Sequence, residues 1–577
     1  MQSLPKHLQK YVVEQNYERY TPVDQAVWRY ILRQLRAFHA VNAHEAYVEG
    51  LEKTGIEVDE IPHIEKISAA LEKFGWRALP VSGFIPPAAF MELQSLGVLP
   101  IASDMRNLDN LLYTPAPDIV HEAAGHAPLL IHPELSDYLK EYAQVAKKAL
   151  ISKEDLELYE AIRDLSDTKE NPLSTPEDIH RAEENLIKVS NSISHISEAA
   201  ELSRMNWWTV EYGLIGSLEN PKIMGAGLLS SVGESKWCLS DKVKKLPLSV
   251  ACIETSYDIT EPQPQLFVTP DFATLKNVLH EMADKMAFKI GGKEGLDKAI
   301  QAESINTVEL NSGLQMSGVV TEVLYDDNGN IIYLKLNGPS QLSYKDQELP
   351  CHGKDYHSHG FGTPLGALKA YPDRCPSTLS SEEFAKAGIS KGELCTLEYA
   401  SGLIVSGIVL DILSKDNKAL ILSLKDATAE FKGRILFQPE WGVFDIALGS
   451  EALSVFGGPA DRISYGETVD FIAKKVPAPK YSELEKEKHS NYGKVRALRK
   501  REIGVEAELD AVISAHQEKF PKDWLLTLEG LEILYFSKTE QTEQLKQKFK
   551  MHLDQLSLKD EKTKNLINDG LKLIGTV

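Results

Sequence analysis

The sequence predicts a multidomain protein with a mostly α first domain, a β-rich duplicated domain, and a C-terminal helical bundle. Three observations lead to this. The chain has 577 residues, too many for one hydrophobic core at about 150 residues per domain. The spacing of apolar residues changes from helical to alternating near residue 300, and residues 316–336 match 405–425 in pattern. We therefore expect domains at 1–300, 301–475 and 480–577.

Residues 1 to about 75 have the apolar spacing of helices that bury one face. The apolar residues that define this face are Ala26, Val27, Trp28, Ile31, Leu32 and Leu35. We expect this segment to be part of the first domain.

The two repeats predict two β-hairpins. Asp327-Asn328-Gly329 in the first and Lys415-Asp416-Asn417-Lys418 in the second are turn residues between β-branched runs. The β-rich domain should end near the proline-containing linker 476–479.

From Tyr481 onward the chain is charged and helical, with an apolar stripe at Leu525, Leu528, Leu531 and Leu534. The roles of the last two domains stay open between oligomerisation, docking to another enzyme and ligand sensing. Cys351, His352, His357 and His359 are compatible with a second metal site, but a Ser/Gly-rich loop with scattered histidines is the commoner case.

Composition limits the partners. A net charge of −21 argues against nucleic acid and acidic membranes, because so acidic a chain repels phosphates. No apolar run reaches the roughly 18 residues that a membrane span needs, and no signal-peptide core is visible. Five cysteines without a CxxC pair suit reduced thiols. We expect a cytoplasmic protein without membrane or nucleic-acid partners.

The run TPAPDIVHEAAGHAPLL at 114–130 indicates a metal site. His121 and His126 are five residues apart, so on a regular α-helix their side chains would diverge by roughly 140°. We therefore expect the backbone to bend between them, with Gly125 supplying the freedom to do so. A bare pair of histidines is about equally compatible with two ordinary side chains.

A third ligand is offered by Glu211, a single carboxylate inside the aromatic and apolar run 206–214. Burying it would be costly unless a cation met it. Two histidines and one carboxylate with open coordination positions are the ligand set of non-haem Fe(II) oxygenases.

With these residues the chain resembles the pterin-dependent aromatic amino acid hydroxylases, most closely bacterial members that act on phenylalanine. The resemblance rests on TPAPDIVHEAAGHAPLL, WWTVEYGL, GAGLLSSVGE and the weaker SYDITEPQPQLFV, which occur in the family's order over roughly residues 75 to 290. It implies Fe(II) and tetrahydrobiopterin or another tetrahydropterin as cofactors, and O2 as co-substrate.

Carried over by position, the resemblance implies three groups of site residues. The iron ligands would be His121, His126 and Glu211. The pterin would contact Gly83, Ile85, Phe90 and Glu122, with Phe90 stacked on its ring. The substrate would contact Arg106, Thr114, Pro117, Trp207, Gly227, Ser230 and Ser231. Of these, Glu122, Arg106, Ser230 and Ser231 would be catalytic, with Arg106 holding the substrate carboxylate in a bidentate pair. Asp118 would orient an imidazole.

The implied reaction is ring hydroxylation of L-phenylalanine to L-tyrosine. Trp207 stands where tryptophan hydroxylases have phenylalanine, and Ile259 gives an apolar contact that suits a ring without a hydroxyl. Hydroxylation of tryptophan or tyrosine is the alternative. Two further alternatives are a metallohydrolase with Glu122 as base, disfavoured by the five-residue spacing, and a non-catalytic scaffold or sensor.

Relative to the family, the segment at about 140–200 contains an insertion. Thr175-Pro176-Glu177-Asp178 predicts a helix N-terminus, followed by helical spacing of Leu186, Val189, Ile193 and Ile196. We favour a surface hairpin over a cover for the active site or an oligomer contact.

Overall fold

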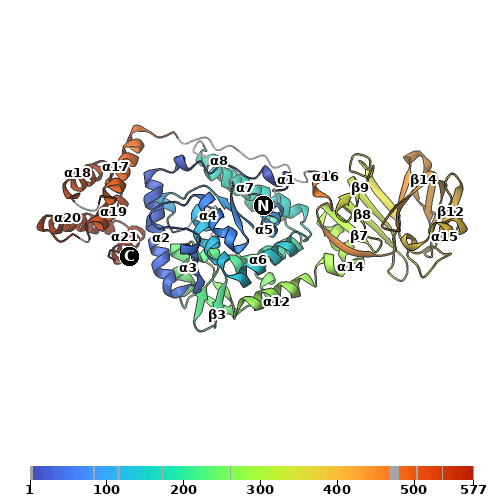
Figure 1. Ribbon diagram of the computed structural model, residues 1–577, viewed down its shortest axis with the longest axis horizontal. Coiled ribbons are helices and arrows are strands. Elements are labelled where there is room, and N and C mark those ends of the chain that lie inside the picture. The colour runs from blue at the N-terminus through green and yellow to red at the C-terminus, as the bar shows by residue number, and fades with distance from the viewer. Residues whose placement is uncertain are drawn as a thin grey trace.

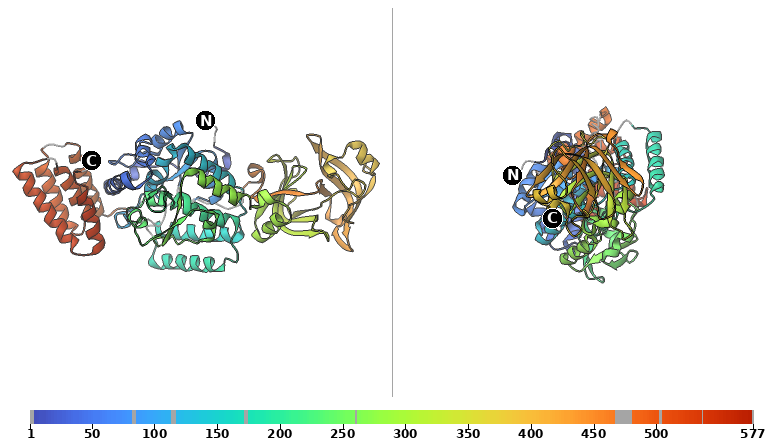
Figure 2. Two further views of the ribbon diagram at one scale, coloured as in Figure 1. Left: turned by 90° about the horizontal axis from the view of Figure 1, so that it is seen from below. Right: turned by 90° about the vertical axis from the view of Figure 1, so that its right-hand side faces the viewer.

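The computed structural model describes residues 4–81, 85–112, 117–170, 174–259, 261–466, 480–501, 504–535 and 537–575. It is elongated, with three parts in a row (Figure 1). Most of the first 300 residues lie in the middle, the C-terminal helices at one end and the β-rich part at the other, as the view from below also shows (Figure 2). The last helices of the first 300 residues, at 287–290 and 292–302, pack against the β-rich part.

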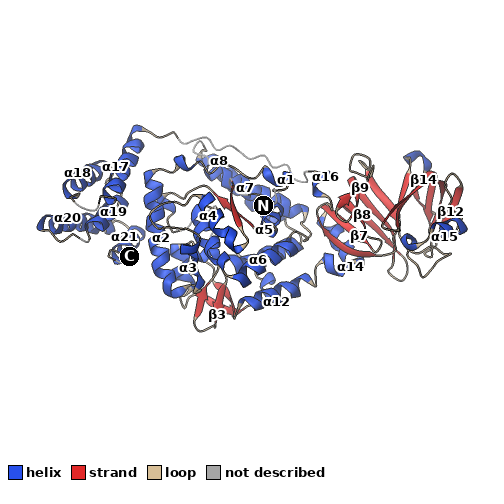
Figure 3. Cartoon of the chain, viewed as in Figure 1, coloured by secondary structure: helices blue, strands red, loops and turns tan. Residues whose placement is uncertain are grey.

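Helices dominate the first part, and short strands lie among them (Figure 3). The helices are α1 (Lys6–Gln9), α2 (Pro22–Asn42), α3 (Ala46–Lys53), α4 (Ile64–Leu71), α5 (Pro87–Ser95), α6 (Pro133–Ala146), α7 (Lys153–Glu170), α8 (Pro176–Ser192), α9 (Glu198–Asn206), α10 (Ala226–Leu229), α11 (Val232–Cys238), α12 (Phe272–Ala283), α13 (Ala287–Ile290) and α14 (Gly292–Ala302). The strands are β1 (Arg77–Val81), β2 (Val98–Ala102), β3 (Leu214–Gly216), β4 (Pro221–Ile223), β5 (Lys244–Pro247) and β6 (Gln265–Thr269). β1 pairs with β2 in parallel, and the other four form a sheet in the order β4-β3-β6-β5.

The expected face of α2 is buried, which confirms that prediction. The helix begins with a capping box, because the Thr21 hydroxyl accepts from the Asp24 amide and the Asp24 carboxylate accepts from the Thr21 amide, with Pro22 at the first position. α8 begins in the same way at Thr175, Pro176 and Asp178, as predicted.

α7 and α8 pack against each other at the edge of the first part. The predicted helical character of this segment is therefore confirmed, but its expected apolar stripe was too long. α8 ends at Ser192, and Ile196 is exposed beyond it.

The β-rich part has two sheets. Its strands are β7 (Ile305–Leu310), β8 (Leu314–Tyr325), β9 (Ile331–Tyr344), β10 (Gln347–Glu348), β11 (Gly360–Pro364), β12 (Leu394–Glu398), β13 (Ile404–Lys415), β14 (Lys418–Phe431), β15 (Arg434–Phe437), β16 (Phe444–Ala447) and β17 (Ala452–Gly457), with the short helices α15 (Ser381–Lys386) and α16 (Arg462–Tyr465). One sheet has the order β10-β9-β8-β7-β17 with β11 on β9, and the other has β12-β13-β14-β15 with β16 on β14.

Both predicted hairpins are confirmed, as β8–β9 and β13–β14. Asp416 and Asn417 turn the second hairpin with positive φ angles of 49° and 61°, as a tight hairpin turn requires. The duplication extends further than the matching sequences. In each half, one strand precedes the hairpin and pairs with its first strand (β7, β12), and a later strand pairs with its second (β11, β16).

The C-terminal helices are α17 (Glu483–Arg499), α18 (Glu506–Lys519), α19 (Leu525–Leu534), α20 (Glu540–Ser557) and α21 (Glu561–Lys572). The predicted leucine stripe is buried along α19. The apolar core of these helices is continuous with that of the first part, and the Tyr30 hydroxyl of α2 donates to the Leu566 carbonyl of α21 at 2.7 Å. The linker predicted at 476–479 lies outside the described residues.

Within the described residues, no helix is both long and apolar enough to cross a membrane.

Candidate metal centre

The segment that carries both histidines is a π-helix, η4 (Val120–His126). In a π-helix the backbone hydrogen bond spans five residues, so positions five apart return to nearly the same face. The amide of Ala127 donates to the Glu122 carbonyl across this span. The predicted bend at Gly125 was therefore wrong, because a regular π-helical turn aligns His121 and His126.

Gly125 has a different role, which is close packing. A Cβ at this position would lie 2.6 Å from the Ala226 carbonyl oxygen, at the first residue of α10. The absence of a side chain lets α10 lie directly against η4.

Glu211 ends a second π-helix, η6 (Trp207–Glu211). Its carboxylate faces both imidazoles, with 3.4 Å from Oε2 to His121 Nε2 and 3.3 Å from Oε1 to His126 Nε2. The two Nε2 atoms are 3.2 Å apart. Ligands that bind one ion at about 2.1 Å and right angles are about 3.0 Å apart, so this triangle fits three neighbouring positions on a metal.

The charges of the cluster favour a cation. Burial alone would lower the pKa of His126, but the Glu211 carboxylate outweighs it and raises this pKa to about 9. Burial opposes ionisation of Glu211, yet the two imidazoles hold its pKa below the usual range. A divalent ion would take the place of the proton that the cluster otherwise holds.

Ser230 orients the first imidazole. Its hydroxyl lies 3.1 Å from His121 Nδ1 and donates to the Ala226 carbonyl at 2.7 Å. The hydroxyl of Ser231 instead caps α11, accepting from the Glu234 amide, and donates to the Leu112 carbonyl.

Asp118 does not orient an imidazole ring, so that prediction was wrong. Its carboxylate binds Arg106 in a bidentate pair, with both N···O distances 2.7 Å, and accepts from the His121 backbone amide at 3.0 Å. Burial would raise the pKa of Asp118, but the Arg106 guanidinium lowers it below its usual value. Since Asp118 takes the Nε and one Nη2 proton of Arg106, a substrate carboxylate would have to use the Nη1 edge.

Glu122 has a buried carboxylate oxygen that a bound group near the centre could contact. Its side chain is buried, burial raises its pKa, and its Oε2 atom has no hydrogen-bond partner among the described residues. A buried polar atom of this kind requires a water or a bound group. The residues present therefore fit a centre that binds a group from outside the protein.

Trp207 lies in a stack of three aromatic rings. Tyr257 lies on one side at 4.3 Å between centroids and Tyr212 at 4.4 Å, both nearly parallel to the indole. Gly227 allows this packing, since a Cβ there would lie 2.8 Å from the Tyr212 ring. The Tyr212 hydroxyl is fixed by Glu234 at 2.5 Å.

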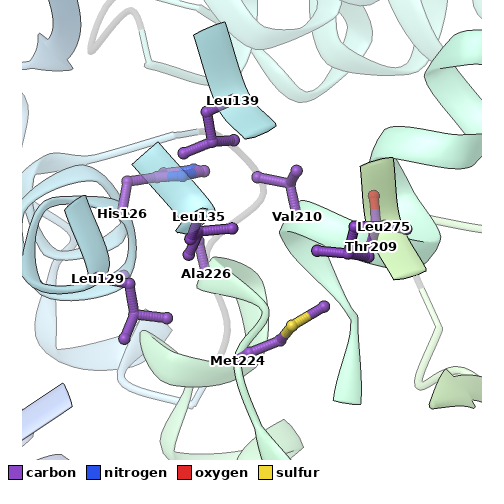
Figure 4. A pocket seen from close by; sticks show the side chains of 10 residues that line it. His126, Leu129, Leu135, Leu139, Thr209, Val210, Met224, Ala226 and Leu275 are labelled. Carbon is purple, nitrogen blue, oxygen red and sulfur yellow. The ribbon is translucent and has the colours of Figure 1, made fainter. Parts of the chain in front are cut away.

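A cavity of about 20 Å³ lies beside His126 (Figure 4). Its lining is mostly apolar and comes from Gly125, His126, Leu129, Leu135, Leu139, Thr209, Val210, Met224, Ala226 and Leu275. This volume holds about one water and is too small for an amino acid or a pterin.

The remaining predicted contacts are spread over several elements. Ile85 is buried and Phe90, on α5, is half-buried, both against an apolar cluster with Leu8 and Leu93. Pro117 is half-buried and Ile259 is 39% exposed. Gly83 and Thr114 lie outside the described residues.

Two imidazoles and a carboxylate converging from two π-helices define a centre of the non-haem iron oxygenase type. The model of the family described as "Biopterin-dependent aromatic amino acid hydroxylase" matches residues 9–156 and 183–294 of this chain. The gap in the match falls in the α7–α8 hairpin.

Three similar proteins carry related names. A phenylalanine-4-hydroxylase of Pseudomonas aeruginosa is 29% identical over 46% of this chain and 86% of its own length. That of Dictyostelium discoideum is 30% identical over 46% of this chain, which spans about half of that relative. A crystal structure of phenylalanine hydroxylase from Chromobacterium violaceum, with iron(III) and 7,8-dihydrobiopterin, is 25% identical and covers 49% of this chain and 90% of its own, at a TM-score of 0.37.

The sequence analysis gave no role to Tyr212, Tyr257 or Glu234, although all three lie within or beside the motifs it used. The sequence signal for the two tyrosines is that they are aromatic residues in the motifs around Trp207. Only the folded chain shows which rings stack.

Proposed function

We propose that this protein hydroxylates the ring of L-phenylalanine to L-tyrosine with O2, Fe(II) and a tetrahydropterin. The observation that carries this proposal is the convergence of His121, His126 and Glu211 within 3.2 to 3.4 Å of one another, in a chain segment that the model of the aromatic amino acid hydroxylase family matches. When bound, the tetrahydropterin would supply the two electrons that reduce one oxygen atom of O2, and Fe(II) would activate O2 so that the other atom enters the ring.

The protein's own residues would position the metal and the substrate. His121, His126 and Glu211 would hold one side of the ion and leave its other side open. Ser230 holds His121 in one orientation through Nδ1, and Arg106 with Asp118 fixes the backbone amide of the same residue. Metal site and carboxylate-binding group are thereby held at a fixed separation, which is what a near-attack geometry needs.

For the substrate, we propose that the Nη1 edge of Arg106 binds the carboxylate. Among the described residues, this edge makes one hydrogen-bond contact, a long one of 3.4 Å to the Ser230 carbonyl. Thr114, Ser230 and Ser231 would assist Arg106 in holding the carboxylate, and Pro117, Trp207 and Gly227 would shape the ring pocket. The stack of Tyr212, Trp207 and Tyr257 supports this role, since it holds the indole rigid.

For the pterin, we propose Gly83, Ile85, Phe90 and Glu122. The half-buried ring of Phe90 is held by an apolar cluster, and such an anchored ring suits a stacking platform. Glu122 would direct its unpartnered Oε2 at the cofactor or at a water between cofactor and metal.

The preference for phenylalanine is supported by Trp207 and Ile259, and by relatives named phenylalanine-4-hydroxylase.

We further propose that the protein acts in the cytoplasm, consistent with the free thiols of its five cysteines. Domain boundaries near 300 and 480 are our proposal as well.

The test is product analysis by mass spectrometry, with phenylalanine, tyrosine and tryptophan competing in one assay containing Fe(II), tetrahydrobiopterin and O2. We expect tyrosine from phenylalanine as the main product, and none when the pterin is omitted. Turnover without pterin would refute the mechanism, and preferred turnover of tryptophan would refute the substrate.

Glu211→Ala is the matching variant, and Glu219→Ala on the nearby surface is its control. Glu211→Ala should lose bound iron and product together, whereas the control should keep both. Equal iron content in Glu211→Ala and the parent would contradict the ligand assignment.

A further inference from the structure

A second set of metal-ligating side chains lies in the β-rich part. His352, His357 and Asp445 are all buried, at 8%, 8% and 4% exposure, and one ligand atom from each lies within 4.8 Å of the others. His352 Nδ1 and His357 Nε2 are 3.2 Å apart. Two nitrogen ligands of one tetrahedral zinc ion, at about 2.05 Å each, are roughly 3.3 Å apart, so this spacing fits a shared ion.

These residues come from the two different sheets. His352 and His357 lie between β10 and β11, and Asp445 lies on β16. The loop is held by its backbone, since the His352 amide donates to the Leu349 carbonyl and the His357 amide to the Gly353 carbonyl. β11 and β16 also contact each other, where the Ala447 amide donates to the Thr363 hydroxyl. The cluster therefore lies where the two halves of the duplication meet.

The charge balance of the cluster lacks a cation. The ring nitrogens of the two buried histidines face each other at 3.2 Å. Asp445 accepts from the Ser423 hydroxyl and from Tyr356. Within the described part of the chain, no lysine or arginine forms an ion pair with Asp445. A carboxylate this deeply buried normally meets a positive charge.

A hydrogen bond between the two imidazoles is the alternative to a metal. It would account for the 3.2 Å distance, but both rings would stay uncharged and the carboxylate would keep an unbalanced charge. A divalent ion satisfies both nitrogens and the carboxylate together.

We propose that His352, His357 and Asp445 bind a divalent transition-metal ion, zinc first, separate from the catalytic centre. Three protein ligands leave a fourth position for water. The ion would join the two sheets of the β-rich part and stabilise their contact. Cys351 and His359, which the sequence also suggested, are exposed outside this ligand set.

The test is zinc binding to the full chain, measured by equilibrium dialysis and elemental analysis after removal of metals with a chelator. Two histidines and a carboxylate can also hold zinc at the first centre, so Glu211→Ala is used to leave only the second site. We expect two zinc ions per chain in the parent, one in Glu211→Ala, one in His357→Ala and none in the double variant. His359→Ala, in the same loop, is the matched control and should keep two.

Asp445→Asn is a second variant that should still fold, because it keeps the shape of the side chain while removing its charge. It should retain the parent's circular dichroism and bind the second zinc at least tenfold more weakly. Zinc should also raise the melting temperature of Glu211→Ala but not of Glu211→Ala/His357→Ala. Absence of zinc from Glu211→Ala, or equal binding by Glu211→Ala and Glu211→Ala/Asp445→Asn, would overturn the proposal. Iron content and hydroxylation by His357→Ala report on the proposed function independently.

Discussion

Arg106 and Asp118 form a buried ion pair beside the proposed substrate site, so a change in either residue should affect both binding and stability. Their side chains are 2% and 4% exposed, and within the described residues they pair with each other and with nearby backbone groups. Removing one partner of a buried pair leaves the other charge uncompensated, which costs more than the pair itself contributes. Arg106 therefore cannot be treated as a binding residue alone.

We predict that Arg106→Ala lowers the free energy of unfolding by about 3–5 kcal/mol in addition to weakening substrate binding. The measurement is urea denaturation of Arg106→Ala, Asp118→Ala and the double variant. The double variant should lose clearly less than the sum of the single variants, because it leaves no charge unpaired. Additive losses would contradict the pairing.

His39 is a buried imidazole that ties α2 to α10. Its Nε2 lies 3.1 Å from the Leu229 carbonyl, and burial lowers its pKa to about 4. In the unfolded chain its pKa is about 6.5, so below that pH the unfolded state takes up a proton that the folded state does not. The stability contributed by neutral His39 is complete above pH 6.5 and is lost as the pH falls toward 4.

We predict that His39→Gln removes part of the acid sensitivity of the protein. At pH 5 the parent should have lost about 2 kcal/mol through this residue relative to pH 7.5, and the variant should not show that share of the loss. The measurement is the difference in unfolding free energy between parent and variant at both pH values. A difference that does not change with pH would exclude this role for His39.

The motifs identified the ligand triad at the residue scale, because residue type and order suffice for it. They could not give the partners of Asp118 or Ser230. Those depend on which side chains the fold brings within hydrogen-bond distance, and Ser230 meets His121 across more than a hundred residues of chain.

At the scale of elements, the two π-helices are the feature that the sequence analysis missed. The five-residue spacing of the histidines correctly excluded a regular α-helix, but it does not distinguish a bend from a π-helical turn. Caps and hairpin turns were predictable since their signals are local, as at Thr175 and Asp416–Asn417. The four-strand extent of the duplication was not, because β11 and β16 pair with strands that lie 20 or more residues earlier in the chain.

The contact between η4 and α10 gives a prediction at this scale. Gly125→Ala would force the two helices apart, since its Cβ would lie 2.6 Å from a backbone oxygen. We expect a loss of about 1–3 kcal/mol in unfolding free energy and reduced iron occupancy, because His126 is the next residue.

Gly233→Ala is the matched control. A Cβ there would have its nearest contact at 3.5 Å, and the residue lies within α11. This variant should be neutral or more stable by a few tenths to 1 kcal/mol, with iron occupancy unchanged. Urea denaturation and elemental analysis of both variants decide the matter, and equal behaviour of the two would contradict the close-packing argument.

At the scale of the whole molecule, the two ends are joined to the middle in different ways. The β-rich part attaches by backbone contacts, such as the Gly457 amide to the Lys148 carbonyl, and by Arg462, whose guanidinium donates to the Lys147 carbonyl. The C-terminal helices share the apolar core of the first part and add buried charges to it.

These charges form a network between α2, α17 and α19. Glu529 binds Arg29 at 3.2 Å and Arg499 at 2.6 Å, and Glu532 binds Arg29 and, at 2.6 Å, Arg33. Both glutamate side chains are 8% exposed. Burial opposes ionisation of Glu529, yet Arg499 and Arg29 lower its pKa, so the carboxylate stays charged.

We predict that Glu532→Gln loosens the C-terminal helices from α2, because Arg29, Arg33 and Arg499 would lose one of the two buried glutamate carboxylates that they contact. Hydrogen exchange followed by mass spectrometry should show lost protection in α2, α17 and α19 and unchanged protection in β7–β17. Glu518→Gln, exposed on α18, is the control and should leave all regions unchanged. If Glu532→Gln exchanged like the parent in α2, the network would be a surface contact of little energy, and the shared apolar core alone would hold this end of the molecule in place.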